Sequence, residues 1–192
     1  MTEIDTTHVP KPRNASATRD AILVAARKEF TKLGFENAST RRIAEDAGCN
    51  VALINRYFES KIGLFEDVMD ACIDLGPVLA GTPDEVVLNL VEICLSKGEA
   101  ALDFDPVLAA IRSGGTEPAK DVVQSQLGEP MVATLAAYIG GDDAHQKAGL
   151  ILSIVAGFDV GRRIMGVEAM QASQNAALQP HLTAAIRAVL EG

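Results

Sequence analysis

Aliphatic residues recur at helical spacing along most of this 192-residue chain, and this periodicity limits the folds open to it. Ile22, Ala26, Phe30 and Leu33, for example, follow positions i, i+4, i+8 and i+11. Only a few short segments alternate as strands do, the aromatic content is 4%, and there is no Trp. We therefore predict an all-α fold, and the hydrophobic content of 48% is enough for a sizeable core.

Start and stop signals divide the N-terminal third into an arm and four helices. Residues 1–15 have no apolar period and are predicted to be a flexible arm. A first helix runs from Thr18 to Gly34, Ser39 caps a second that ends at Gly48, and Asn50 caps a third. A linking helix over about residues 60–75 follows, ending before Gly76-Pro77.

The C-terminal two thirds contain further helix signals. Thr82-Pro83-Asp84-Glu85 combines a capping threonine with a glutamate three residues later, which predicts a helix to about residue 101. Shorter helices are expected after Asp105-Pro106 and from Glu117 to Gly140, the latter divided at Pro130. The most apolar helix is predicted from 142 to about 166, and the last from about Pro180 to Leu190.

Charge is distributed unevenly along the chain. The net charge is −9, yet residues 11–61 contain ten Lys or Arg against six acids. Residues 62–192 contain seven basic residues and eighteen acids. Such a chain can hold one face against phosphate while the rest stays soluble, although ordinary surface variation also gives this pattern.

Two short helices joined by a glycine-containing turn and preceded by a packing helix are the parts of a helix-turn-helix. In that motif the second helix presents side chains to the DNA major groove. The apolar periodicity places Arg41, Asn55 and Arg56 away from the core. For Arg42 and Arg56, a solvated helix face is an equally ordinary role.

The segment "TRDAILVAARKEFTKLGFENASTRRIAEDAGCNVALINRYFESKIGLFEDV" resembles the N-terminal domain of the TetR (tetracycline repressor) family of transcriptional regulators. The resemblance covers about fifty residues. The residues that match the family pattern are Ile22, Leu23, Ala25, Ala26, Phe30, Gly34, Ser39, Ile43, Ala44, Ala47, Gly48, Tyr57, Phe58, Ser60, Lys61 and Leu64.

The resemblance implies a helix-turn-helix DNA-binding domain over residues 16–62 and a larger helical regulatory and dimerisation domain over 76–192. It places Thr40, Arg41 and Asn55 at DNA-contacting positions and matches Lys61 to a phosphate-contacting lysine. Arg41 can bind guanine or phosphate, and Asn55 can bind adenine or phosphate. The candidate DNA-binding residues are Ser39, Thr40, Arg41, Asn50, Val51, Ala52, Asn55, Arg56, Tyr57 and Lys61.

Three positions depart from the family pattern. Asn55 stands where a tyrosine is common, and Cys49 and Asn50 stand where valine and serine are usual. If the tyrosine contact to the DNA backbone is missing, Arg56 or Tyr57 has to compensate. Cys49 is expected to be a small buried hydrophobe.

The resemblance also implies a palindromic double-stranded DNA operator, a small-molecule ligand in the C-terminal domain, and a homodimer formed through the last two helices. Gly149, Gly157 and Gly161 would allow a second helix to approach closely, although these helices can equally be buried within one monomer. Candidate ligand-binding residues are Phe104, Arg112, Met131, Tyr138, Phe158 and Arg162. Arg162 and Arg163 have a competing role as ion-pair partners of Asp159.

Other function classes have less support. Cys49, Cys72 and Cys94 have no metal-ligand spacing and no histidine nearby in sequence, so we expect no metal, no cofactor and no enzyme, with a cysteine enzyme as the remote alternative. The longest apolar stretch, residues 148–158, is too short to cross a membrane, and no secretory signal is visible, so a cytoplasmic location is expected. A ligand-independent regulator or an activator stays open as an alternative to a ligand-released repressor.

Overall fold

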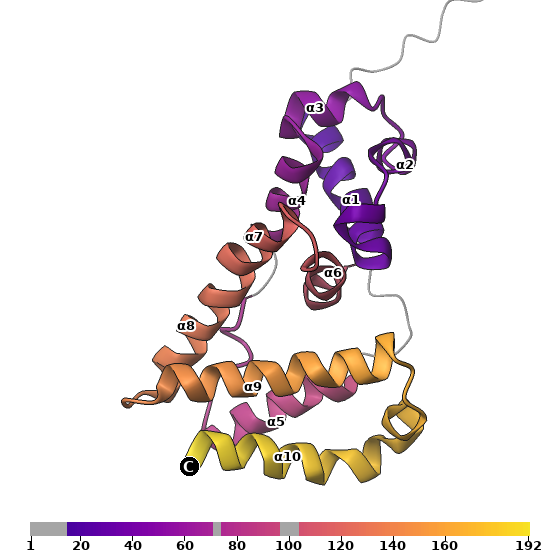
Figure 1. Cartoon of the computed structure of the whole chain (residues 1–192). Helices are drawn as coiled ribbons and strands as arrows, with labels where there is room; N and C mark the ends of the chain where they lie inside the picture. Colours follow the sequence, from indigo (N-terminus) through magenta and orange to yellow (C-terminus); the bar gives the residue numbers. More distant parts are fainter. Residues whose placement is uncertain (1–14, 71–73, 97–103) are drawn as a thin grey trace, which may run out of the picture.

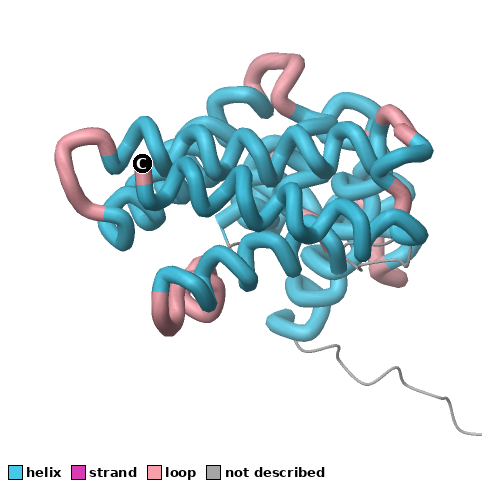
Figure 2. Tube along the Cα trace, turned by 90° about the horizontal axis from the view of Figure 1, so that it is seen from below, coloured by secondary structure: helices cyan, strands magenta, loops and turns pink. Residues whose placement is uncertain are grey.

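The computed structural model describes residues 15–70, 74–96 and 104–192, and this part of the chain contains helices, turns and loops but no strand (Figures 1 and 2). The all-α prediction is therefore confirmed. The predicted arm, with Lys11 and Arg13, lies outside the described residues, except for Ala15 at the start of the first helix. Cys72 also lies outside the described residues.

The N-terminal part consists of four helices: α1 (Ala15–Asn37), α2 (Thr40–Asp46), α3 (Ala52–Phe58) and α4 (Lys61–Asp70). The predicted stripe of α1 is buried, with Ile22, Ala26 and Phe30 all at 0% exposure. Gly34 interrupts α1 with a φ of 71°, and a Cβ there would lie 2.5 Å from the carbonyl oxygen of Arg112. Only glycine fits both the backbone conformation and this close approach.

The C-terminal part contains α5 (Pro83–Ser96), α6 (Pro106–Ser113), α7 (Ala119–Val123), α8 (Glu129–Ile139), α9 (Ala144–Asp159) and α10 (Asn175–Glu191). A π-helix, η1 (Gln124–Gly128), joins α7 to α8, and a second, η2 (Val160–Ile164), follows α9. Two 3₁₀ turns, η3 (Glu168–Met170) and η4 (Ala172–Gln174), precede α10. The division of the 117–140 helix near Pro130 is confirmed, with η1 immediately before it.

One helix changes its type before its predicted end, and one predicted helix start was wrong. The most apolar helix ends as an α-helix at Asp159 and continues as η2, because the backbone changes to the wider π pattern where Arg162 and Arg163 make tertiary contacts. The last helix starts at Asn175 instead of Pro180. Pro180 is exposed inside α10, so the helix bears the loss of one backbone donor near its N-terminal end.

The buried residues form two separate hydrophobic cores. The first joins α1–α4 with α6, α7 and η1, and it contains a cluster of Phe30, Phe35 and Phe65. The second joins α5, α8, α9 and α10. In Figure 1, α7 and α8 follow one another from the upper part of the molecule to the lower part, where α9 and α10 lie in front of α5. The elements α6, α7 and η1 therefore pack with the helix-turn-helix although they lie beyond residue 76.

Candidate nucleic-acid interface

The first turn of α2 is fixed by two oxygen acceptors. Ser39 precedes the helix in an extended conformation, and its Oγ accepts a hydrogen bond of 3.4 Å from the N–H of Arg42, as its predicted capping role requires. Glu29 reaches across from α1, and its Oε1 accepts a 3.3 Å bond from the N–H of Ser39. Glu29 is only 5% exposed, so this carboxylate depends on the N-terminal end of α2 and on the Arg42 guanidinium 3.8 Å away. These contacts hold α2 in a fixed position on α1.

The turn between α2 and α3 uses a positive backbone angle and an asparagine cap. Gly48 has a φ of 61°, and the N–H of Cys49 bonds to the carbonyl of Ala44 at 2.9 Å. The Oδ1 of Asn50 accepts a 2.9 Å hydrogen bond from the N–H of Ala52, which satisfies one of the unpaired donors at the start of α3. Cys49 is half-buried and packs against the first core, in agreement with a role as a small hydrophobe.

Helix α3 has one buried side and one exposed side. Ile54 and Phe58 are buried, at 0% and 4% exposure, and anchor the helix to α1 and α4 in the first core. The opposite arc consists of Val51, Ala52, Asn55 and Arg56, all exposed. The periodicity of the sequence predicted this arc correctly.

Tyr57 and Lys61 are partly occupied by contacts within the chain. The Tyr57 ring is half-buried and meets the Phe58 ring at 6.3 Å. The Nζ of Lys61 donates to the carbonyl of Glu36 at 3.1 Å and lies 4.7 Å from the centre of the Phe35 ring. Burial lowers the pKa of Lys61 below its ordinary value of 10.5, against the opposing effect of Glu36 and Glu29. Its ammonium group therefore also fastens α4 to the end of α1.

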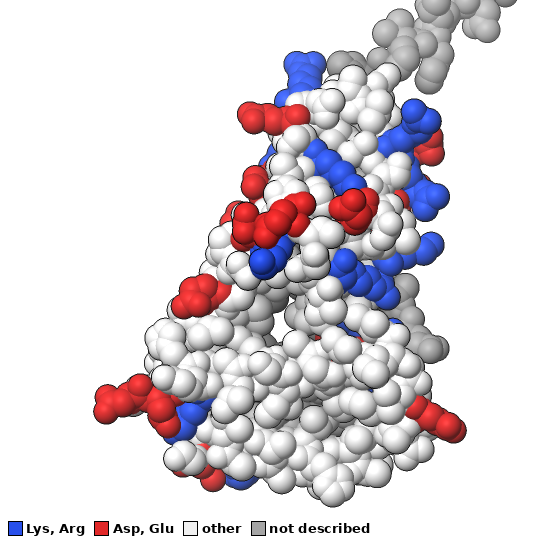
Figure 3. Space-filling view, in the orientation of Figure 1, with Lys and Arg blue, Asp and Glu red and all other residues white. Residues whose placement is uncertain are grey.

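Arg41 and Arg56 contrast with Arg42 and Lys61. Both are exposed, and neither side chain makes a hydrogen bond or ion pair with another described residue. In Figure 3, Lys and Arg side chains project from the upper part of the molecule, around α1, α2 and α3, with acidic residues among them. Thr40, at the start of α2, is half-exposed beside Arg41. The helix-turn-helix thus presents unpaired cations on the same part of the molecule as the exposed arc of α3.

Helix α6 joins the helix-turn-helix to the C-terminal part. The N–H of Phe35 donates a buried 2.9 Å bond to Ser113 Oγ, and the N–H of Asp105 donates to Thr31 Oγ1 at 3.1 Å. Arg112 was predicted to bind a ligand, but its Nη1 donates to the carbonyls of Thr31 and Lys32 near the end of α1, at 2.5 and 2.9 Å. Its side chain binds the carbonyl groups where the helix stops at Gly34, which is a favourable place for a cation.

Arg162 also has a structural role that differs from the ligand-binding one predicted for it. Its guanidinium donates to the carbonyls of Cys94 and Leu95, at 3.3 and 3.1 Å, and to Asn175 Oδ1 at 2.5 Å. It also lies 4.7 Å from the centre of the Phe158 ring. Arg162 is 5% exposed, and burial lowers its pKa. These contacts attach η2 to α5 and α10.

Arg163 connects two buried carboxylates. Its Nη2 lies 2.5 Å from Asp105 Oδ2 and 3.2 Å from Asp159 Oδ2, and both acids are 1% exposed or less. The i, i+4 pair with Asp159 was predicted, but the longer-range partner Asp105 was not. Asp105 also caps α6 by accepting from the N–H of Leu108. Arg163 therefore links η2 directly to the start of α6.

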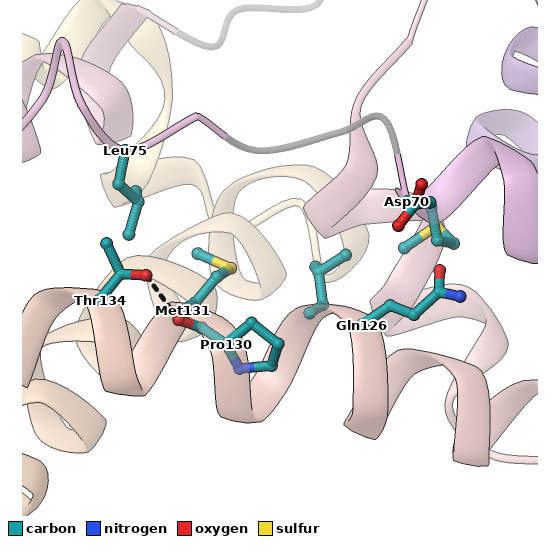
Figure 4. A pocket seen from close by; sticks show the side chains of 8 residues that line it. Asp70, Leu75, Gln126, Pro130, Met131 and Thr134 are labelled. Atoms are coloured by element: carbon teal, nitrogen blue, oxygen red, sulfur yellow. Dashed lines mark hydrogen bonds between the residues drawn. The ribbon is translucent and has the colours of Figure 1, made fainter.

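A cavity of about 80 Å³ opens between the end of α4, the loop at Leu75, η1 and the start of α8. Figure 4 shows Gln126 and Asp70 at one end of it and Met131 near its middle. Of the six residues predicted to bind ligand, Met131 alone lines this cavity. Phe104 packs half-buried against the first core, and Tyr138 and Phe158 pack with the second. The structure does not bring the six together.

The outward surface of α9 and α10 is poor in charge. Leu150 is 56% exposed, and a Cβ placed at Gly149 or Gly157 would meet no described atom within 4 Å apart from its chain neighbours and the adjacent backbone of its own helix. Gly161 differs, because a Cβ there would meet Met170 Sδ at 2.6 Å, so its close neighbour belongs to the same chain. Figure 3 shows that α9 and α10 present a broad surface almost free of Lys, Arg, Asp and Glu.

Within residues 15–70, 74–96 and 104–192, no three His, Cys, Asp or Glu side chains are grouped so that they could hold a metal ion. None of the helices in these ranges has the length and apolar character needed to cross a membrane.

Two family models match the chain and together cover both of its parts. The one described as "Bacterial regulatory proteins, tetR family" matches residues 22–68, and the one described as "Tetracyclin repressor-like, C-terminal domain" matches residues 84–190. The chain belongs to the TetR family of bacterial regulatory proteins. The helix-turn-helix of α2 and α3 is therefore the DNA-binding part of a TetR-family transcriptional regulator.

Individual proteins similar to this chain are also transcriptional regulators or repressors. The chain is 42% identical over 53 residues to a probable HTH-type transcriptional regulator, YttP, of Bacillus subtilis, a match that covers 28% of this chain and 26% of that protein. A TetR-family regulator of Streptomyces coelicolor has the same fold, with a TM-score of 0.55, 23% identity, and coverage of 95% of this chain and 99% of that one. NalD of Pseudomonas aeruginosa, the secondary repressor of a multidrug efflux pump, has a TM-score of 0.60, 16% identity and coverage of 92% and 97%.

Proposed function

We propose that this TetR-family chain is a homodimeric repressor that binds a palindromic operator and leaves it when a small ligand binds the C-terminal part. The observation that carries the DNA-binding half of this proposal is the exposed arc of α3, supported by α1 and by the capped turn before it. Arg41, beside this arc, is available for phosphate or guanine contacts, and Arg56, within it, for phosphate contacts, whereas Lys61 already donates one hydrogen bond to the carbonyl of Glu36.

The dimer is proposed to form through α9 and α10. Their exposed surface combines Leu150 with the open positions Gly149 and Gly157, which suits close helix packing against a second copy. Its shortage of charge keeps the desolvation cost of such an interface low. Dimerisation would set the two α3 helices roughly 34–36 Å apart, the spacing of successive major grooves on one face of DNA.

The ligand is proposed to enter between the two cores. Figure 3 shows a hollow in the surface at the level where Figure 1 places α6, α8 and α9. A ligand there would act on α6, which is bonded to α1 through Ser113 and Arg112 and to η2 through Arg163. It would release DNA only if it bound better to a conformation with a different α3 spacing, through a coupling of typically about 1–3 kcal/mol.

A gel-shift series on the DNA upstream of the chain's own gene tests the operator claim. We expect a discrete complex that survives excess non-specific competitor and physiological salt. Binding that does not depend on sequence and disappears at moderate salt would contradict the proposal. A thermal-shift screen of small apolar compounds tests the ligand claim separately, because a true ligand raises the melting temperature and releases the gel-shifted DNA. A compound set that does neither would favour a ligand-independent regulator.

A further inference from the structure

The exposed arc of α3 is unusual in having apolar side chains at its N-terminal end. Val51 is 43% exposed, and Ala52 beside it is also exposed. Residues 51 and 55 are about one helical turn apart, and so are residues 52 and 56, so each pair lies along one side of the exposed arc. The N-terminal residues of a recognition helix are those that contact base edges. Any DNA bound by this helix would therefore meet Val51 and Ala52 together with Asn55.

The polar groups available near Val51 and Ala52 are few. Asn50 uses its Oδ1 to accept from the N–H of Ala52, so that oxygen is already occupied. Asn55 is exposed and makes no side-chain hydrogen bond to another described residue, so its donor and acceptor are both available. The cation of the arc, Arg56, lies at its C-terminal end.

Base pairs differ in what they offer to such a surface. In the major groove, thymine presents a C5-methyl group, and adenine presents an acceptor and a donor that one Asn side chain can bind together. An exposed valine or alanine gains by covering a methyl group and gains nothing by covering the exposed amino group of cytosine. The unpaired Arg41 and Arg56 on the same part of the molecule favour a polyanion over an apolar protein partner for this surface.

We propose that Val51 and Ala52 contact thymine methyl groups and that Asn55 binds adenine, so that the bases read by α3 in each half-site are A·T pairs. This inference rests on the proposed function, since it assigns the base preference of a DNA-binding surface. It also gives a physical role to an exposed valine that the core does not need. The group read by Val51 is a single methyl group, and its presence in DNA can be changed without altering base pairing.

Substituting deoxyuridine for thymidine removes that methyl group and leaves the pairing edge intact. The full chain is first used to select bound duplexes from a random pool. Each thymidine of the selected half-site is then replaced in turn, and the Kd is measured by fluorescence anisotropy. We expect A·T pairs at the α3-contacted positions and about fourfold weaker binding for each contacted methyl group removed.

Two valine variants locate the effect. Val51→Ala should bind the thymidine duplex more weakly and lose most of its sensitivity to deoxyuridine at one position. Val24→Ala makes the same truncation at an exposed valine of α1, 48% exposed, and should keep the full sensitivity. Circular dichroism and urea unfolding check that both variants fold like the wild type.

The outcomes separate this inference from the proposed function. If selection enriches a specific site but deoxyuridine leaves every Kd unchanged, or if the α3-contacted positions are G·C pairs, the base assignment is overturned while sequence-specific binding stands. If Val24→Ala and Val51→Ala lose their sensitivity to deoxyuridine equally, Val51 is not the residue that contacts the thymine methyl group. If selection enriches no sequence at all, the proposed function itself fails.

Discussion

The N–H of Ser39 donates a 3.3 Å hydrogen bond to Oε1 of the buried Glu29, and this bond fixes the first helix of the helix-turn-helix on α1. A carboxylate with so little exposure persists because a helix N-terminus and the guanidinium of Arg42 both face it. The position of α3, and hence of its exposed arc, depends on this attachment of α2.

Replacing Glu29 by alanine should destabilise the chain by about 1–3 kcal/mol, because it leaves the N–H of Ser39 without its partner. Glu29→Gln keeps an acceptor oxygen and should cost less. Urea unfolding measures both variants, with Glu45→Ala as the control at an exposed position of α2. Equal stability of Glu29→Ala and Glu45→Ala would contradict the role given to Glu29.

Breaking the link between η2 and α6 should cost more than breaking a surface ion pair. Arg163→Met leaves Asp105 and Asp159, both buried, without their shared cation and should destabilise the chain by about 3–5 kcal/mol. Arg187→Met removes an exposed pair with Asp84 on α5 and should leave the unfolding midpoint close to that of the wild type. Similar midpoints for the two variants would contradict the role given to Arg163.

Titration of Glu85 should report the capping box at the start of α5. Hydrogen bonds from the N–H and hydroxyl of Thr82, at 2.7 and 2.9 Å, lower the pKa of Glu85 below its ordinary value of 4.5. A lowered pKa means that the stabilisation is present above pH 4.5 and is lost as the pH falls through the folded-state pKa.

Carbon-13 NMR of the Glu85 carboxyl group measures this shift. Thr82→Ala should move the pKa of Glu85 up toward 4.5, since the hydroxyl donor is gone, whereas Thr82→Ser keeps a hydroxyl and should preserve most of the lowering. A pKa for Glu85 that is the same in all three proteins would count against the capping box in solution.

A charge on the exposed surface of α9 should prevent dimerisation. Leu150→Asp places a carboxylate where the proposed interface would bury it, so we expect a monomer in analytical ultracentrifugation at concentrations where the wild type is a dimer. Leu88→Asp makes the same change at a residue of α5 that is 49% exposed and should remain dimeric. A dimeric Leu150→Asp protein would place the interface elsewhere.

Structural features that depend on residues a few positions apart, such as helix caps, could be predicted from the sequence. Ser39, Asn50 and Thr82 accept hydrogen bonds from N–H groups two or three residues away, so their capping roles are visible in a short window. The apolar period of α3 likewise separated Ile54 and Phe58 from the exposed arc. The start of α10 was missed because proline most often marks the first turn, whereas Pro180 lies one turn further in.

Contacts between distant residues were not predictable in the same way. Arg163 and Asp105 are 58 positions apart, and Arg112 is 80 or more positions from the carbonyls it binds. Nothing in the neighbouring sequence distinguishes an arginine that binds backbone carbonyl groups from one that binds a ligand. The burial of Glu29 had one indication in the sequence, because this residue lies on the buried side of α1, directly before Phe30.

Sequence-specific recognition by α3 is tested most directly by fluorescence anisotropy on the selected operator and on a duplex of the same composition in shuffled order. We predict that the wild type binds the operator at least about 10³-fold more tightly than the shuffled duplex at physiological salt. The Asn55→Ala variant should lose about 1–3 kcal/mol of this discrimination, while its affinity for the shuffled duplex stays that of the wild type. Equal affinity of the wild type for the two duplexes, or a loss in Asn55→Ala that is the same on both, would contradict the account.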